Sequence, residues 1–390
     1  MSKNFVSKFQ KRKILFLPLV LGIATAAEAQ NAGDPIPNSF ICVFKPGPIS
    51  AGAEARQSVA AVGGRVDRVY TSALRGFSAT MSETAVNKLI EKNPLIDYCE
   101  QDRYAAIPEP NDGATGPAAR PGGGGGGTTA ETVPWGVTRV GGGANYSGGN
   151  SAWVIDSGID LNHPDLNVDV TRSISFLARE LSPDDANGHG THVAGTIAAL
   201  AGNGRGVVGV AAGAPVVALR VLDRRGSGPD SGVIAAIDHA VRNGQAGVVI
   251  NLSLITSYMQ SMNDAVANAS AANFFVAIAA GNSAVDASNY SPASAEGANV
   301  YTVSAFEQVD KWAFYSNYGA PVDFAEPGSS IYSTSKDGGY ATKSGTSMAA
   351  PHMAGILLLG GAALLNGGSP NSSGVVIGDP DASSDPIGVK

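Results

Sequence analysis

The sequence predicts an α/β protein with a doubly wound parallel sheet, preceded by a small α+β domain. Beyond residue 130, short apolar runs alternate with stretches of helical periodicity, the pattern of a parallel sheet covered on both faces. Between residues 38 and 107 the predicted order is β-α-β-β-α-β, which gives one sheet with helices on one face. With 44% hydrophobic and 15% charged residues, the 390-residue chain can bury both cores.

Residues 1–29 have the pattern of an export signal. A positively charged front precedes the short apolar run 14–23, and Ala27-Glu28-Ala29 forms a small-x-small cleavage site. The alternative is an uncleaved anchor, but the apolar run is shorter than the roughly 18 residues that a membrane helix needs. We therefore expect a secreted, extracellular protein with no membrane attachment once the signal is removed.

The small domain, residues 38–107, follows the signal. Strands are predicted over residues 39–44, 65–70, 76–81 and 96–101, and helices over residues 53–62 and 83–92. Ser82 is the expected cap of the second helix. The chain's two cysteines, Cys42 and Cys99, both lie in this domain. Export permits a bridge between them, and two buried free thiols are the open alternative.

Two segments are too rich in small and polar residues to hold a packed structure. Residues 108–129 contain several prolines and a six-glycine run, so we expect a flexible, cleavable linker; a permanent tether is the alternative. Residues 367–390 are rich in Gly, Ser, Asp and Pro and are predicted to be a disordered tail.

The main domain is expected over residues 130–366. The predicted strands are 151–155, 216–221, 248–252, 274–279 and 300–304, and the predicted helices are 190–200, 231–243, 259–272 and 348–365. Active sites of such sheets lie at the carboxyl ends of the strands. Asp156 and Asn282 each follow a predicted strand there. The formal net charge of −7, concentrated in this domain, argues against nucleic-acid binding and is compatible with cation binding.

Three polar residues stand out, each with a plainer alternative. Ser347, in SGTSMAAPH, begins an apolar helix, where the dipole favours developing negative charge; it could also be a simple helix cap. His189, in NGHGTHVAGT, is left open by its glycine neighbours. Asp156, in VIDSG, ends a buried strand, where a carboxylate needs hydrogen bonds and a cationic partner; the alternative is a turn-capping Asp before Gly158.

Together these residues predict nucleophilic catalysis. A serine hydroxyl needs a base, a histidine supplies it, and an aspartate holds the histidine tautomer and stabilises the imidazolium. Asn282, in AAGN, can donate its side-chain N–H to an oxyanion. His192 follows His189 with no Glu between them, so a zinc HExxH site is absent, and His192 is expected to be a buried structural histidine.

The segments VIDSGI, HGTHVAGT, AAGN and GTSMAAPH resemble those of the subtilisin family, and so does the order Asp, His, Ser. The resemblance runs from Val133 to about Leu365, and NYSPAS and FYSNYG are similar to the proteinase K branch. Residues 39–107, with VYTSALRGFSATMS and DYCEQD, resemble the inhibitory, ferredoxin-like propeptide of these enzymes.

The resemblance implies a monomeric serine endopeptidase of broad specificity, made as an autoprocessed zymogen that cuts protein and peptide substrates without a catalytic cofactor. Its own propeptide would assist folding and then inhibit it, and self-cleavage is expected between Pro121 and Thr132. Extended substrate would pair with an edge strand at Ser253 and Leu254. The opposite wall would be formed by Ala279, Ala280 and Gly281.

The sequence departs from the family pattern at two points that matter for the site. Ile255 stands where the family usually has Gly, which leaves the pocket preference open, and residues 201–206, with Arg205, replace a calcium-binding loop of some members. Asp323 matches a calcium ligand of the proteinase K branch, with the carbonyls of Ala298 and Val300. The alternative for Asp323 is a capping or salt-bridged surface residue.

Two other functions would require features that the sequence lacks. A non-catalytic relative that only binds peptides would need a broken triad or a blocked cleft, and the triad residues are all present. An esterase of the α/β-hydrolase type would need G-x-S-x-G and the order Ser, Asp, His, whereas Ser347 comes last here.

Overall fold

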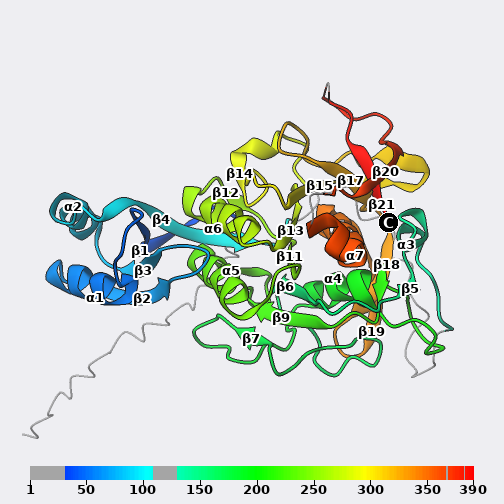
Figure 1. Cartoon of the computed structure of the whole chain (residues 1–390), viewed down its shortest axis with the longest axis horizontal. Helices are drawn as coiled ribbons and strands as arrows, with labels where there is room; N and C mark the ends of the chain where they lie inside the picture. Colours follow the sequence, from blue (N-terminus) through cyan, green and yellow to red (C-terminus); the bar gives the residue numbers. More distant parts are fainter. Residues whose placement is uncertain (1–30, 109–129, 366–367, 382) are drawn as a thin grey trace, which may run out of the picture.

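The computed structural model describes residues 31–108, 130–365, 368–381 and 383–390 (Figure 1). The expected signal, residues 1–29, and nearly all of the expected linker lie outside these residues. Among the described residues, no helix is both long and apolar enough to cross a membrane.

A parallel sheet forms the centre of the main domain, as predicted. Its strands are β6 (Ala152–Asp156), β7 (Ile174–Ser175), β9 (Val216–Arg220), β11 (Val249–Leu252), β13 (Phe275–Ala279), β15 (Val300–Glu307) and β17 (Phe324–Pro327). They lie in the order β17-β15-β13-β11-β6-β9-β7. After β6 the chain forms β7 at the edge, then β9 between β7 and β6, and then crosses to the other side of β6 as β11. The carboxyl ends of β6 and β11 therefore meet at the point where the winding reverses, which is where such sheets place their sites.

Helices cover both faces of this sheet (Figure 1). The helices α4 (His189–Ala198) and α7 (Thr346–Leu365) share one apolar core with the sheet, and α5 (Asp230–Asn243) and α6 (Gln260–Ala271) share another. Alternate residues of a strand serve the two cores: Val154 lies in the first, and Trp153 and Ile155 in the second. Because both faces are covered, β6 is apolar along its length until Asp156.

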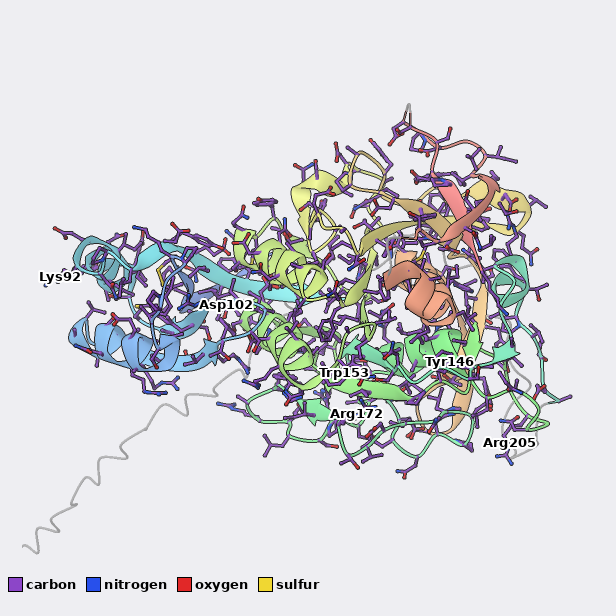
Figure 2. All side chains as sticks on the ribbon, in the orientation of Figure 1. Lys92, Asp102, Tyr146, Trp153, Arg172 and Arg205 are labelled. Atoms are coloured by element: carbon purple, nitrogen blue, oxygen red, sulfur yellow. A yellow bond between two sulfur atoms is a disulfide. The ribbon has the colours of Figure 1, made fainter. Side chains whose placement is uncertain are left out.

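The small domain has the element order that the sequence predicts. It consists of β1 (Pro35–Phe44), α1 (Ala51–Ala61), β2 (Arg65–Tyr70), β3 (Gly76–Thr80), α2 (Glu83–Lys92) and β4 (Ile96–Ala106). The four strands form an antiparallel sheet in the order β4-β1-β3-β2, with both helices on one face. Ser82 caps α2 by accepting from the Ala85 N–H. Cys42 and Cys99, directly opposite in the β1–β4 register, form a disulfide (Figure 2).

The other face of this small sheet docks on α5 and α6. Figure 2 shows Asp102 at the junction between the two domains. Its Oδ1 accepts from the Ser231 N–H in the first turn of α5 at 3.0 Å. Glu100 Oε1 accepts from the Ser261 N–H in the first turn of α6 at 2.7 Å. A carboxylate at each helix start accepts from a free N–H and is stabilised by the positive end of the helix dipole. These contacts therefore hold the two domains together.

The shorter elements connect these layers. They are α3 (Trp135–Arg139), β5 (Ala144–Asn145), β8 (Ala211–Ala212), β10 (Ser227–Pro229), β12 (Thr256–Ser257), η1 (Ala287–Asn289), β14 (Tyr290–Ser291), η2 (Gln308–Asp310), β16 (Lys311–Trp312), β18 (Ile331–Ser335) and β19 (Gly339–Lys343).

The C-terminal tail differs from the disorder predicted for residues 367–390. Its described part forms β20 (Asn371–Val375) and β21 (Pro386–Val389), and β21 adds to the edge of the main sheet beside β17. Ile387 is fully buried in a small core with Phe306. The prediction from composition is wrong here, because two buried apolar residues, Val376 and Ile387, and an open strand edge are enough to order a short polar segment.

Candidate active site

Asp156 and His189 form a buried pair at the carboxyl edge of the sheet. Asp156 is the last residue of β6, and His189 is the first residue of α4. Both carboxylate oxygens of Asp156 lie 2.9 Å from His189 Nδ1, and both side chains are buried. Gly190 makes this approach possible, since a Cβ there would come within 2.1 Å of the Gly158 carbonyl oxygen. A buried carboxylate that faces an imidazole can hold its tautomer and stabilise its charged form.

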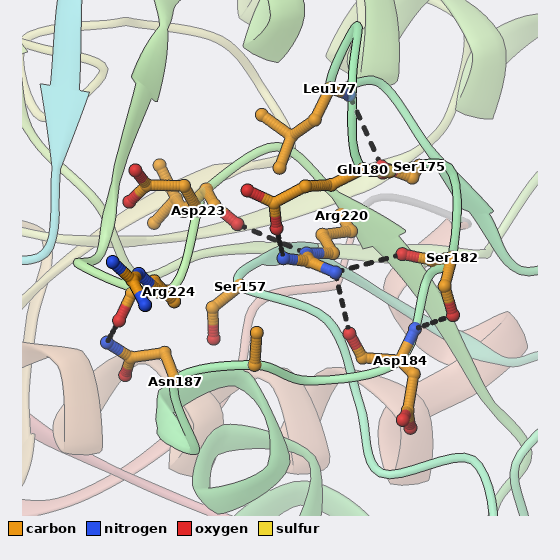
Figure 3. A network of polar contacts seen from close by, with 12 residues as sticks. Ser157, Ser175, Leu177, Glu180, Ser182, Asp184, Asn187, Arg220, Asp223 and Arg224 are labelled. Carbon is orange, nitrogen blue, oxygen red and sulfur yellow. Dashed lines mark hydrogen bonds and ion pairs between the residues drawn. The ribbon is translucent and has the colours of Figure 1, made fainter.

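Arg220, at the end of β9, anchors the loop that leads to His189 (Figure 3). Its guanidinium donates to the carbonyls of Ser182 and Asp184 at 3.1 and 3.0 Å, and it pairs with the Glu180 carboxylate. Farther along the loop, the Asn187 side chain accepts from the His189 N–H at 3.2 Å. A buried arginine with several acceptors is a rigid support, so the start of α4 is fixed against the end of β9.

Ser347 lies in the first turn of α7, buried at the same edge of the sheet. Its hydroxyl donates to the Ser253 carbonyl at 3.3 Å, directly after β11. His189 Nε2 has no hydrogen-bond partner among the described residues. The helices α4 and α7 pack against each other in the shared core. The structure thus brings both predicted residues to one edge, without a hydrogen bond between them.

Asn282, which follows β13, has the orientation of an oxyanion donor. Its Oδ1 accepts from the Thr346 N–H at 2.8 Å and from the Thr346 hydroxyl at 2.9 Å. These two bonds hold the amide, so the Nδ2 group faces the other way. There it donates to the carbonyl oxygen of Pro108 at 2.6 Å. The predicted donor therefore holds a peptide carbonyl oxygen.

The end of β4 lies in the cleft between two backbone edges. On one side Ala106 and Ile255 exchange two N–H···O bonds, each of 2.9 Å. On the other side Ala106 pairs with Ser227 of β10, and the Ile107 N–H donates to the Gly226 carbonyl at 3.0 Å. This is β-augmentation, the expected mode of substrate recognition.

The sequence-predicted walls need two additions. Pairing runs through Ile255, next to the predicted Ser253 and Leu254. The second edge, β10 with Gly226, was not predicted, and the short Gly-rich run after the β9 strand was its only signal in the sequence. Across the cleft, the Ile255 side chain reaches the predicted wall of Ala279–Gly281, since a Cβ on Gly281 would lie 2.6 Å from Ile255 Cδ1.

His192 and Asp323 have different outcomes. His192 is fully buried, with Nε2 3.1 Å from the carbonyls of Ile331 and Ala341, and burial lowers its pKa to about 3, so the prediction of a structural histidine is confirmed. Asp323 accepts from the Thr302 N–H at 2.8 Å, and burial raises its pKa to about 6. No cluster of three or more His, Cys, Asp or Glu that could bind a metal occurs in the described part of the chain.

The chain is similar to known proteins along most of its length. The model of the subtilase family matches residues 151–372. The chain belongs to the subtilase family. It is a subtilisin-like serine protease, and therefore a hydrolase.

The subtilase is similar over most of its length to other members of the family. It is 32% identical to the subtilisin-like serine protease AsES of Sarocladium strictum, with 88% of this chain and 86% of the relative covered. It is 33% identical to Proteinase R of Parengyodontium album, over 85% of this chain and 81% of the relative, which supports the likeness to the proteinase K branch. A solved cold-adapted subtilisin-like serine proteinase is 34% identical, with a TM-score of 0.56, covering 65% of this chain and 96% of that one.

Proposed function

We propose that this subtilase is a secreted endopeptidase that hydrolyses peptide bonds through an acyl-enzyme, with Asp156, His189 and Ser347 as its catalytic triad. The observation that carries the proposal is the 2.6 Å hydrogen bond from Asn282 Nδ2 to the carbonyl oxygen of Pro108. A strand that enters the cleft from the small domain delivers a peptide carbonyl to the side-chain N–H of Asn282, which Thr346 at the start of α7 holds in place. The same placement would serve a protein or peptide substrate.

The reaction begins with transfer of the Ser347 proton to His189 Nε2, the ring nitrogen that has no partner among the described residues. Ser347 Oγ then bonds to the substrate carbonyl carbon, and Asp156 stabilises the imidazolium through Nδ1. Asn282 Nδ2 and the Ser347 N–H donate to the oxyanion. His189 next gives the proton to the leaving amine, and water, activated by the same histidine, releases the acid product.

The small domain, residues 38–107, acts in this proposal as an inhibitory propeptide that also assists folding. Its last strand fills the cleft, and its carboxylates Glu100 and Asp102 cap α6 and α5. Asp238, in α5, accepts from three successive N–H groups of the small domain, at Thr71, Ser72 and Ala73. These contacts would favour the native arrangement of α5 and α6, and the occupied cleft would exclude other substrates until the chain is cut.

Backbone recognition supports broad specificity, because any peptide bond in extended form offers the same N–H and carbonyl groups. We also propose that the enzyme is a monomer and that it needs no catalytic cofactor. A structural calcium ion would bind at Asp323, with the carbonyls of Ala298 and Val300 as further ligands. The reason is that burial raises the pKa of Asp323, and a bound cation would offset the cost of its buried charge. That single carboxylate would supply the charge, and carbonyl and water oxygens the remaining ligands.

A fluorophosphonate probe tests the catalytic assignment. The secreted protein is incubated with the probe, digested, and mapped by mass spectrometry, while casein hydrolysis is followed in parallel. We expect the adduct on Ser347 and no hydrolysis by Ser347→Ala, with Ser344→Ala as the matched control that retains both signals. A correctly folded wild-type protein that neither reacts with the probe nor hydrolyses casein would be a peptide-binding relative.

A further inference from the structure

The clearest feature outside the expected site residues is the end of β4, where residues 106–108 lead into the catalytic centre. We propose that the enzyme makes its first self-cleavage at the bond between Pro108 and Glu109, and that Pro108 slows this cut. The inference rests on the proposed function, since it needs an active triad. It gives the processing site and explains how an uncut chain would persist long enough to fold.

The backbone register identifies the bond. Ala106 and Ile255 form a hydrogen-bonded antiparallel pair, with both N–H···O distances at 2.9 Å. Such pairs recur at every second residue, so continuation of this register sets Pro108 opposite Ser253. Ser253 is the residue whose carbonyl accepts from the Ser347 hydroxyl. The register alone therefore brings Pro108 to the nucleophile.

The carbonyl oxygen of Pro108 supports the same bond independently. It accepts from Asn282 Nδ2 at 2.6 Å, and the Pro108 side chain is buried. An amide that holds a carbonyl oxygen polarises that carbonyl for attack. The interval from Pro121 to Thr132, where the sequence suggests a cut, lies largely outside the described residues. A cut there would be a second event, made after the bond at Pro108 has been cleaved.

Proline changes the chemistry at this position, because its ring nitrogen carries no hydrogen. At position 108 the register calls for an N–H that donates to the Ser253 carbonyl, in the way that the Ala106 N–H donates to Ile255. The Ser347 hydroxyl takes that place, donating to the Ser253 carbonyl at 3.3 Å, while His189 Nε2 has no partner among the described residues.

The hydroxyl is thereby held away from its base. To react, the hydroxyl must break its hydrogen bond to the Ser253 carbonyl. Pro108 has no N–H that could replace the hydroxyl as donor, and a buried carbonyl that loses its donor costs free energy. An ordinary residue at position 108 would occupy the Ser253 carbonyl and free the hydroxyl for His189. Pro108 thus binds in the position for cleavage while it weakens the hydrogen-bond arrangement that cleavage requires.

The cut itself balances as an ordinary acyl transfer. Ser347 Oγ bonds to the Pro108 carbonyl carbon, its proton passes to His189, and the bond to the Glu109 nitrogen breaks as that nitrogen takes the proton. Water then adds to the ester, leaves Pro108 with a free carboxylate, and returns a proton to Ser347. No other reactant is needed.

Mapping of the fragment ends tests the cleavage site. The full chain is expressed, sampled at early times, and quenched with a fluorophosphonate, and both fragments are measured by intact mass and terminal sequencing. We expect a first fragment that ends at Pro108 and a partner that begins at Glu109. An active protease whose earliest fragments end elsewhere, including only between residues 121 and 132, would overturn the inference.

The rate of processing tests the role of proline. Pro108→Ala restores an N–H, and we expect the first cut to be roughly 2-fold to 10-fold faster, the gain of one hydrogen bond. Pro121→Ala, the same substitution in the linker, should leave the rate unchanged. An unchanged or slower rate in Pro108→Ala would overturn the slowing effect.

The two proposals fail in distinguishable ways. If the triad assignment is wrong, the wild-type chain will neither react with the probe nor cut itself, and Ser347→Ala will match it. If only the present inference is wrong, the wild-type enzyme will react at Ser347 and hydrolyse casein, but the fragment ends or the Pro108→Ala rate will disagree.

Discussion

The imidazole of His189 faces both carboxylate oxygens of Asp156 at 2.9 Å, and the Asp156 side chain has no exposed surface. One N–H shared between two oxygens fixes both the tautomer and the plane of the ring. The opposite ring nitrogen, Nε2, has no partner among the described residues and can accept the Ser347 proton. The Asp156–His189 pair therefore determines which ring nitrogen acts as the base in the proposed reaction.

Asp156→Asn should lower kcat about 10⁴-fold while KM changes little, because an amide can donate to Nδ1 and so favours the wrong tautomer. The measurement is steady-state hydrolysis of a chromogenic peptide, with active enzyme counted by burst titration. Asp169→Asn, in a carboxylate paired with Arg172 instead of a histidine, serves as the control and should keep full activity. A loss of less than tenfold in Asp156→Asn would contradict the assignment.

The sequence predicted most of what depends on local pattern. The buried strands are recognisable because β6, β11 and β13 consist mostly of apolar residues, and polar residues such as Asp156 and Asn282 stand out because they come at the end of an apolar run. The parallel sheet then brings those ends together without further information.

The rest depends on contacts between distant segments, which have no local pattern. Nothing in the short run of β10 shows that it will pair with the end of β4, and nothing near Pro108 shows that its carbonyl will meet Asn282. The tail was mispredicted for the same reason, since β21 is ordered by the edge of β17 and by the burial of Ile387.

Ile255→Ala should widen the preference for the residue before the cut. The Ile255 side chain is nearly buried and reaches toward Gly281 on the opposite wall, so it leaves little room for a large side chain. We expect kcat/KM for substrates with Phe before the cut to rise roughly 10-fold to 100-fold relative to Ala. The measurement is digestion of a peptide library. The wild type and Ile377→Ala, a control at an exposed site, should show the same preference for the residue before the cut. An unchanged ratio in Ile255→Ala would show that another residue limits the pocket.

Loss of the disulfide should affect folding of the precursor and spare the finished enzyme. Cys42 and Cys99 are 57 residues apart within the small domain, and closing such a loop contributes roughly 4 kcal/mol to stability. In Cys42→Ser/Cys99→Ser we expect a severalfold lower yield of active protease with unchanged specific activity, measured by burst titration. In the Ser347→Ala background, the same pair should lower the unfolding temperature of the intact chain. Equal yields would mean that the folding role does not need the bridge.

Calcium removal tests the proposed site at Asp323. If a cation binds there, adding calcium should raise the unfolding temperature of Ser347→Ala by a few degrees, and a chelator should reverse the change. Because burial raises the pKa of Asp323 to about 6, the gain should be larger at pH 8 than at pH 5, where the proton competes. Asp323→Asn should abolish the calcium effect, and Asp337→Asn, at a surface turn, should retain it. An equal calcium effect in both variants would show that the ion does not bind at Asp323.

Acid should destabilise the folded chain through His192. Burial lowers its pKa from the ordinary 6.5 to about 3, so below about pH 6.5 the unfolded chain takes up a proton that the folded chain refuses. Stability from this group is complete above pH 6.5 and is lost as the pH falls, by about 1.4 kcal/mol per pH unit. His352, whose pKa burial lowers to about 4, acts in the same direction. Asp323 and Asp385, whose pKa values burial raises to about 6 and about 7, oppose it over the same range.

The test for His192 is therefore a comparison between variants. In the Ser347→Ala background, His192→Gln can still donate to the Ile331 or Ala341 carbonyl and cannot be charged. Chemical denaturation between pH 6.5 and pH 4.5 should show a shallower loss of unfolding free energy in His192→Gln, while the opposing carboxylates remain common to both proteins. Parallel pH profiles would mean that His192 is protonated in the folded chain, which its two carbonyl partners and complete burial argue against.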